Sequence, residues 1–145
     1  MQIDDLKKLP INDDELYFDY DLKKLNWFNI GGKTKVFFKA KSLTGLVNFL
    51  KTFKKRGKIF VLGAGSNVLI SDDDFNGVVI KLGKNFQNLS ILNENLVISG
   101  CGTSQKRLSE FSKENSLTGM EFMSCIPGSV GGGIRMNSGC FDNEF

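Results

Sequence analysis

Glycines that follow an apolar run are the most chemically suggestive residues of this sequence. The stretch Val61–Ile70 begins as an apolar run and continues through Gly63, Ala64 and Gly65. Glycine adopts positive φ without strain, and consecutive backbone N–H groups in such a loop can converge on an anion. The loop therefore predicts a phosphate cradle, with an ordinary turn as the alternative. The dinucleotide fingerprint is incomplete because Val68 stands where it needs its third glycine.

A second set of small residues, Ser99–Ser104, contains Gly100 and Gly102. It precedes an expected helix that Thr103 or Ser104 can cap. The motif predicts a second surface formed by backbone atoms, which a flat or phosphorylated ligand could approach closely. A plain strand-to-helix turn is the alternative.

The third set is the stretch 119–139, which contains six glycines, three of them consecutive at Gly131–Gly133. Each glycine in a regular element costs roughly 0.5–1 kcal/mol relative to alanine. We therefore expect a ligand or another backbone to approach closely here, with Asn137 and Ser138 as nearby hydrogen-bonding groups. Tight packing of a helix is the alternative for part of the run.

Several chemistries are excluded by composition. The 145 residues include no histidine, which rules out Ser-His and Cys-His nucleophiles and histidine-ligated metals within this chain. Cys101, Cys125 and Cys140 are too few and too widely spaced for a zinc site or a disulfide framework. We expect reduced thiols and no metal site in this chain.

Charge and hydropathy place the protein among cytoplasmic globular proteins. The net charge of +3 is too small to predict nucleic-acid binding. The basic run from Lys51 to Lys58 is typical of a solvated helix end. Because no apolar run approaches the ~18 residues of a membrane span and no secretion signal begins the chain, we expect no membrane association.

The elements that must position these loops can be predicted from periodicity. Residues 36–38, 58–62 and 77–82 are expected strands. A helix is expected from a cap at Ser42 to Gly57, with one apolar face formed by Leu43, Leu46, Val47, Leu50 and Phe53. A strand, a helix and a strand in this order predict a small parallel β-α-β unit.

The remaining elements complete an α+β rather than an alternating pattern. Residues 89–92 and 96–99 predict an antiparallel hairpin. A second helix is expected to begin at Thr103 or Ser104 and to bury Leu108 and Phe111. Residues 1–25 are expected to form an N-terminal arm with a short helix or turn.

Taken together and in order, five motifs resemble one known family. They are Asn26–Gly32, Leu62–Asn67, Gly119–Phe122, Ile126–Gly132 and Met136–Gly139. The chain is similar to the UDP-N-acetylenolpyruvoylglucosamine reductases, also called UDP-N-acetylmuramate dehydrogenases. The resemblance implies a two-lobed FAD-binding fold of the vanillyl-alcohol oxidase (PCMH) type, with a small parallel β-α-β lobe and a second mixed lobe. It also implies an FAD-binding domain at 26–145, truncated at its C-terminal end and lacking the substrate-binding domain.

The resemblance further implies a set of cofactor-binding residues. The stretch from Gly63 would cradle the pyrophosphate, the later glycine stretches would line the flavin and its phosphates, and residues 29–32 would close the entry side. The implied residues are Asn29, Ile30, Gly31, Leu62, Gly63, Ala64, Gly65, Ser66, Asn67, Val68, Leu69, Gly100, Cys101, Gly102, Thr103, Ser104, Gly119, Glu121, Phe122, Ile126, Pro127, Gly128, Ser129, Val130, Gly131, Gly132, Met136 and Asn137. Two departures from the family pattern are Trp27, in place of a small threonine, and Phe141, in place of a tyrosine.

In this family NADPH reduces FAD, and the reduced flavin passes a hydride to UDP-N-acetylglucosamine-enolpyruvate. The product is UDP-N-acetylmuramate, a precursor of peptidoglycan. The family's arginine, glutamate and serine for this chemistry lie downstream of the matching segment, so residues 1–145 alone are expected to be inactive. Two alternatives stay open: another flavin oxidase or dehydrogenase of the same fold, and a non-enzymatic nucleotide-binding or interaction module. The oligomeric state is not predicted.

Overall fold

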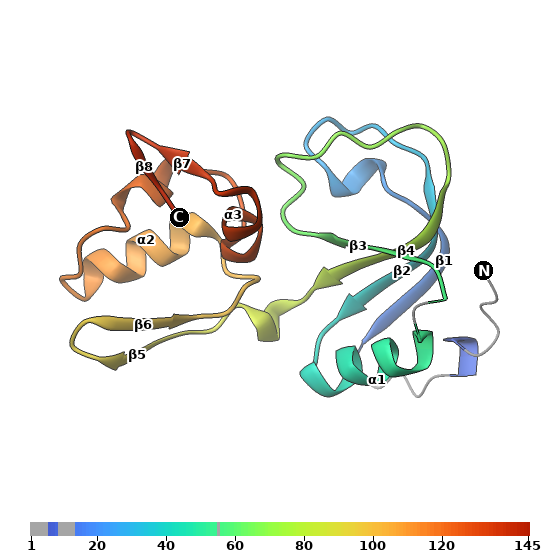
Figure 1. The fold of residues 1–145 in the computed structure, drawn as a ribbon, viewed down its shortest axis with the longest axis horizontal. Coiled ribbons are helices and arrows are strands. Elements are labelled where there is room, and N and C mark those ends of the chain that lie inside the picture. The colour runs from blue at the N-terminus through green and yellow to red at the C-terminus, as the bar shows by residue number, and fades with distance from the viewer. Residues whose placement is uncertain (1–5, 9–13, 55) are drawn as a thin grey trace. The chain divides into compact units, whose positions relative to one another are not determined.

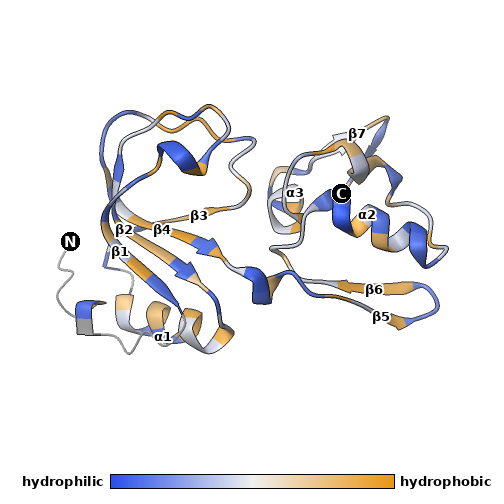
Figure 2. Cartoon of the chain, turned by 180° about the vertical axis from the view of Figure 1, so that it is seen from behind, coloured by the Kyte–Doolittle hydropathy of each residue, from blue (hydrophilic) through white to orange (hydrophobic). Residues whose placement is uncertain are grey.

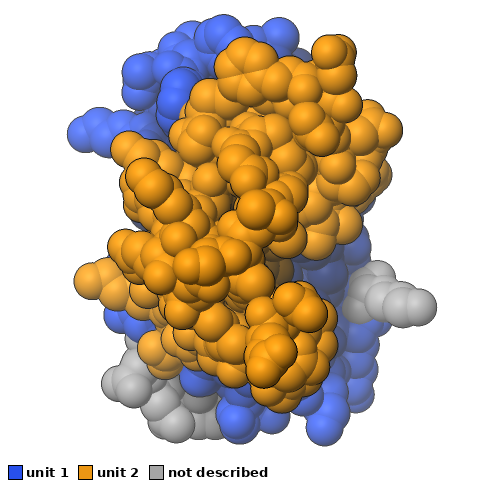
Figure 3. All heavy atoms as spheres, turned by 90° about the vertical axis from the view of Figure 1, so that its left-hand side faces the viewer, with its two compact units in different colours: residues 1–62, 67–83 blue, residues 63–66, 84–145 orange. Residues whose placement is uncertain are grey.

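The chain folds into two compact units, each with its own core. The structure is a computed structural model that describes residues 6–8, 14–54 and 56–145. Unit 1 comprises Met1–Leu62 and Asn67–Gly83, and unit 2 comprises Gly63–Ser66 and Lys84–Phe145 (Figure 3). The short loop 63–66 therefore belongs to the same unit as the later glycine stretches.

Unit 1 is built on a four-stranded sheet with the order β1-β2-β4-β3 (Figure 1). The strands are β1 (Glu15–Asp21), β2 (Lys33–Ala40), β3 (Lys58–Leu62) and β4 (Phe75–Leu82). Strands β2 and β3 are both parallel to β4, and α1 (Leu43–Phe53) connects them. The predicted parallel β-α-β unit is confirmed, but β4 lies between its two strands. Figure 2 shows hydrophobic residues along these central strands, as expected for a sheet that is covered on both faces.

The prediction of a helix or turn was wrong for residues 15–21, which form β1. This strand pairs antiparallel with β2, and Tyr20 stacks on Phe37 with ring centroids 4.5 Å apart. Leu16, Phe18 and Tyr20 alternate with more exposed residues, and cross-strand packing stabilises such an alternation. Short 3-10 turns do form at Leu6–Lys8 and Lys23–Leu25. The rest of the predicted arm, residues 1–5 and 9–13, lies outside the described residues.

Helix α1 begins as predicted but ends early. The Ser42 side chain accepts a hydrogen bond from the Gly45 N–H at 2.9 Å, which caps the first turn. The last helical residue is Phe53, not a residue near Gly57. Lys54 adopts a left-handed conformation with φ of 48° and donates its N–H to the Leu50 carbonyl, so the helix is capped before the glycine.

Of the residues predicted for the buried face of α1, only Phe53 is fully buried. Phe49 and Phe53 are buried, and Phe49 stacks on Phe38 of β2 with ring centroids 4.1 Å apart. Leu43, by contrast, is 68% exposed, and Val47 and Leu50 are exposed as well. Two aromatic rings four residues apart bury more apolar area than the aliphatic stripe, so the helix turns its phenylalanines toward the sheet.

Unit 2 combines a hairpin with two helices. Its elements are β5 (Leu89–Asn93), β6 (Leu96–Ser99), α2 (Gln105–Glu114), a 3-10 helix (Glu121–Cys125), α3 (Val130–Met136), β7 (Gly139–Cys140) and β8 (Asn143–Glu144), and a further 3-10 turn at Lys84–Phe86 leads into them. The predicted hairpin and the cap at Ser104 are confirmed. The core consists of Leu108, Phe122, Met123 and Val130, whereas Phe111 is only partly buried.

Within the described residues, no helix has the length and apolar character needed to cross a lipid bilayer. The same residues contain no group of three or more metal-ligating side chains.

The stacked phenylalanines of unit 1 yield a stability prediction. Phe49→Ala should lower the free energy of unfolding by about 3–5 kcal/mol, because it leaves a cavity between α1 and β2. The matched control Leu43→Ala, on the exposed side of the same helix, should change it by less than about 0.5 kcal/mol. Urea denaturation monitored by circular dichroism measures both, and equal effects would contradict the assigned helix face.

Candidate functional site

Three glycine-containing stretches that are distant in sequence meet in unit 2. The Val130 and Gly131 N–H groups donate to the Thr103 and Cys101 carbonyls, both at 2.8 Å. In return, the Gln105 N–H donates to the Gly128 carbonyl at 2.9 Å. These bonds hold residues 100–105 and 127–133 side by side, with backbone in direct contact with backbone.

The loop Gly63–Ser66 joins the same assembly. The Ser66 hydroxyl donates a hydrogen bond to the Pro127 carbonyl. A Cβ at Gly63 would lie 2.8 Å from the Ser129 Oγ, so the start of the loop faces the cap of α3. Residues 63–66, 100–105 and 127–133 thus form one backbone surface, which we call the glycine surface.

Some glycines of this surface are required by the packing of the chain on itself. A Cβ at Gly100 would collide with the Phe86 carbonyl, and one at Gly131 would lie 3.0 Å from the Cys101 carbonyl oxygen. Backbone atoms cannot move aside as a side chain can. For these two glycines, close approach of another backbone is therefore a sufficient explanation.

Gly132 is not explained in this way. A Cβ there would meet only the Ser129 Oγ, at 3.1 Å, which is a small hydroxyl at the end of a side chain. That hydroxyl accepts the Gly132 N–H and caps α3. A glycine inside a helix costs about 1 kcal/mol relative to alanine, and a Cβ at Gly132 would press on this capping hydroxyl rather than on backbone. Close approach of a ligand is therefore a further reason for a glycine at this position.

The loop 63–66 has unused hydrogen-bond donors. Gly65 is buried and has a φ of +76°, in the region that glycine accepts most easily. Across the described part of the chain, the backbone N–H groups of Ala64, Gly65 and Ser66 have no hydrogen-bond acceptor. Consecutive free N–H groups in a turn bind anions, and a pyrophosphate fits this chemistry.

Thr103 contributes a further unsatisfied group. Its Oγ1 is buried and has no hydrogen-bond partner among the described residues. A buried hydroxyl without a partner costs about 1–3 kcal/mol. This hydroxyl lies behind the glycine surface, because Thr103 is 0% exposed. The donors that a nucleotide can reach are the backbone N–H groups of residues 64–66, which suit the phosphates of a nucleotide cofactor.

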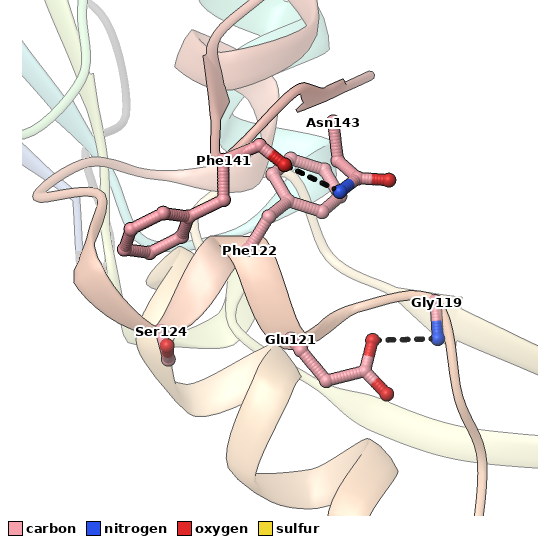
Figure 4. A pocket seen from close by; sticks show the side chains of 6 residues that line it. All are labelled: Gly119, Glu121, Phe122, Ser124, Phe141 and Asn143. Carbon is pink, nitrogen blue, oxygen red and sulfur yellow. Dashed lines mark hydrogen bonds between the residues drawn. The ribbon is translucent and has the colours of Figure 1, made fainter.

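Gly119, Glu121 and Phe122 lie around a separate pocket of about 340 Å³ in unit 2 (Figure 4). Ser124, Phe141 and Asn143 complete its lining. The Glu121 carboxylate accepts the Gly119 N–H at 2.7 Å, and the Asn143 side-chain amide donates to the Phe141 carbonyl at 2.8 Å. The Phe122 ring is turned into the core of the unit, because its side chain is only 7% exposed.

The other predicted residues are spread over both units. Leu62 and Val68 pack in the core of unit 1, whereas Leu69 of the same unit is 74% exposed. Asn29 and Ile30 are exposed in unit 1, beside Gly31, where a Cβ would collide with Ile70. Asn67 is exposed in unit 1. In unit 2, Gly102 and Ser104 belong to the glycine surface, whereas Ile126, Met136 and Asn137 lie next to the segment 127–133 in the sequence or at the end of α3.

Sequence reasoning missed Gln105. Its side chain is 1% exposed, its Oε1 accepts the Ser138 hydroxyl at 3.2 Å, and its amide lies behind Gly128 and Gly133. It therefore supports the glycine surface from within. A single polar residue at the start of a helix is normally solvent-exposed, so no local pattern could have identified it.

Comparison with known proteins agrees with this geometry. The chain matches the FAD binding domain family over residues 34–145. It is 53% identical to the UDP-N-acetylenolpyruvoylglucosamine reductase of Pelagibacter ubique, over 100% of this chain and 48% of that protein. It is 43% identical to the reductase of the same name from Rickettsia felis, over 94% of this chain and 46% of that one.

A solved structure shows the same fold. The crystal structure of the UDP-N-acetylenolpyruvylglucosamine reductase from Thermus caldophilus superposes with a TM-score of 0.69 at 27% identity, covering 90% of this chain and 44% of that one. The present chain thus spans about half the length of the relatives it matches. The fold is accordingly the predicted α+β FAD-binding type. The family match covers most of the sequence and includes all three stretches of the glycine surface, so this chain belongs to the FAD binding domain family.

Proposed function

We propose that this chain is the FAD-binding part of an NADPH-dependent reductase that converts UDP-N-acetylglucosamine-enolpyruvate to UDP-N-acetylmuramate. The names of the relatives, at 53% and 43% identity, support this activity. The observation that carries the cofactor assignment is the row of unpaired N–H groups at Ala64, Gly65 and Ser66. We assign residues 26–145 to the FAD-binding domain, and β1 (Glu15–Asp21) joins it by pairing with β2 in the sheet of unit 1. The cytoplasm, which supplies NADPH and UDP-sugars, is the proposed location.

Each part of the glycine surface has a role in this proposal. The N–H groups of residues 64–66 donate to the pyrophosphate of the cofactor. The Ser66–Pro127 hydrogen bond holds that loop against the segment 127–133. Gly132, which has no side chain and is partly exposed, lets a flat ring approach the backbone of α3.

Bound FAD supplies hydride transfer between NADPH and the enolpyruvyl double bond. Hydride addition to an alkene conjugated with a carboxylate builds up negative charge, which must be stabilised and then neutralised by a proton. We assign neither role to a residue of this chain: the Glu121 carboxylate is already bonded to the Gly119 N–H. The UDP-sugar is likewise assigned to residues outside 1–145.

The unpaired Thr103 hydroxyl yields a stability prediction that is separate from cofactor binding. Thr103→Val keeps the shape of the side chain but removes the buried Oγ1, so the FAD-free protein should gain about 1 kcal/mol of unfolding free energy. The affinity for FAD should stay within about 2-fold, because Thr103 is 0% exposed and its hydroxyl cannot reach the cofactor. Denaturation and fluorescence titration measure the two quantities. A loss of stability, or a large loss of affinity, would contradict this placement of the hydroxyl.

Alanine substitutions at two glycines should have different effects. Gly132→Ala should change the stability by no more than about 1 kcal/mol, because the gain in helix propensity is offset by a methyl group 3.1 Å from the capping Ser129 Oγ. The same variant should bind FAD about 10-fold more weakly, because the methyl group stands on the glycine surface. Gly100→Ala should instead destabilise the fold by about 1–3 kcal/mol, because its methyl group meets the Phe86 carbonyl. Flavin absorbance after dialysis, normalised to protein, reports binding. Unchanged flavin content in Gly132→Ala would show that the cofactor does not approach Gly132.

The proposed activity has a direct assay. The full-length protein should be yellow, with about one FAD per chain, and should oxidise NADPH only after UDP-N-acetylglucosamine-enolpyruvate is added. Residues 1–145 alone should show no turnover. A flavin-bearing protein that ignores this substrate and oxidises an alcohol or sugar would favour a different flavoenzyme of this fold. A protein that binds no flavin would favour a non-enzymatic module.

A further inference from the structure

Two of the three cysteines, far apart in sequence, lie within contact distance in unit 2. The Cys125 and Cys140 sulfurs are 3.2 Å apart. Cys125 ends the 3-10 helix Glu121–Cys125, and Cys140 ends β7. The spacing of the cysteines along the chain predicts reduced thiols without a disulfide framework, whereas the tertiary fold brings these two into contact.

The pair is accessible and close to bonding geometry. Cys125 is exposed and Cys140 is partly exposed, so a small oxidant can reach them. A disulfide has a sulfur–sulfur distance of about 2.05 Å, so the two atoms need to approach by roughly 1 Å. The turn that follows Cys140 can accommodate this shift, because Phe141 at its tip is 75% exposed and does not anchor it in a core.

The two thiols are chemically unequal. The hydrogen bond with Cys125 raises the pKa of the Cys140 thiol above its ordinary value, and burial adds to the effect. Cys125 is exposed whereas Cys140 is only partly exposed, so a peroxide reaches the Cys125 sulfur first. The thiolate is the form of cysteine that attacks an oxidant.

We propose that Cys125 and Cys140 are a redox modification site that closes into an intramolecular disulfide when the protein meets a peroxide. The Cys125 thiolate attacks one peroxide oxygen, the O–O bond breaks, and the departing hydroxide takes up the proton that Cys125 released. The Cys140 sulfur then attacks the resulting sulfenic acid. The S–S bond forms, the S–O bond breaks, and water leaves with the Cys140 proton. The two thiols lose two electrons and the peroxide gains them.

The location gives this bond a structural consequence. It closes a loop that contains α3 and the segment 127–133, which is one of the three stretches of the glycine surface. Cross-linking such a loop restricts the unfolded chain more than the folded one. In a reducing compartment a bond of this kind is transient, which is typical of redox sensing.

Peptide mapping of the full-length protein tests the proposal. The protein, with its flavin bound, is treated with hydrogen peroxide, alkylated, digested and analysed by mass spectrometry. We expect a cross-linked peptide pair containing Cys125 and Cys140, which dithiothreitol separates, while Cys101 in the same sample joins no such pair. The oxidised protein should also melt several degrees higher than an equally treated Cys140→Ser variant. Absence of the 125–140 cross-link, or cross-links between chains only, would overturn the proposal.

The order of attack is tested by trapping the intermediate. In Cys140→Ser, dimedone should label Cys125 as the sulfenic acid, several-fold more than it labels Cys140 in Cys125→Ser. Equal labelling, or labelling of Cys140 alone, would overturn the assigned order. Serine is close to cysteine in size, and circular dichroism of both variants verifies that the fold is retained. None of these readouts depends on the proposed reductase activity, so the two proposals can fail separately.

Discussion

The direct contact of backbone with backbone between residues 100–105 and 127–131 is the constraint on which the glycine surface depends. The Val130 and Gly131 N–H groups reach the Thr103 and Cys101 carbonyls only because no side chain stands between the two segments. Gly100 and Gly131 are thus structural glycines. Their loss would separate the segments and would disrupt the surface before any ligand was involved.

Glycine plays two different roles in this unit, and the structure separates them. At Gly100 a side chain would collide with backbone, whereas at Gly132 it would meet only a hydroxyl. The first kind of glycine loses conformational entropy on folding but allows two backbone segments to pack against each other. The second kind avoids only a contact with the capping Ser129 hydroxyl, and the unpaired N–H groups of residues 64–66 lie in the same assembly. In the proposed function, the pyrophosphate of FAD would use these donors and its ring would approach Gly132.

Local patterns were sufficient where an element is stabilised by its own residues. The strand at 58–62, the hairpin of β5 and β6, and the caps at Ser42 and Ser104 follow from alternation, turn residues and hydroxyl acceptors. Local patterns failed where the structure of a segment depends on a residue that is distant in the sequence. Strand β1 forms because it pairs with β2. The buried face of α1 is set by the stacking of Phe49 on Phe38, and Gln105 is held inside unit 2 by its hydrogen bond with Ser138.

The sequence by itself determined the type of most elements, the glycine-rich loops and, through the order of its motifs, the family resemblance. These features depend on neighbouring residues, so they can be read along the chain. The tertiary structure alone decided which glycines pack against backbone, which donors stay unpaired, and which two thiols meet. Those properties depend on atoms tens of residues apart, because folding brings together groups whose separation along the chain carries no information about their distance in space.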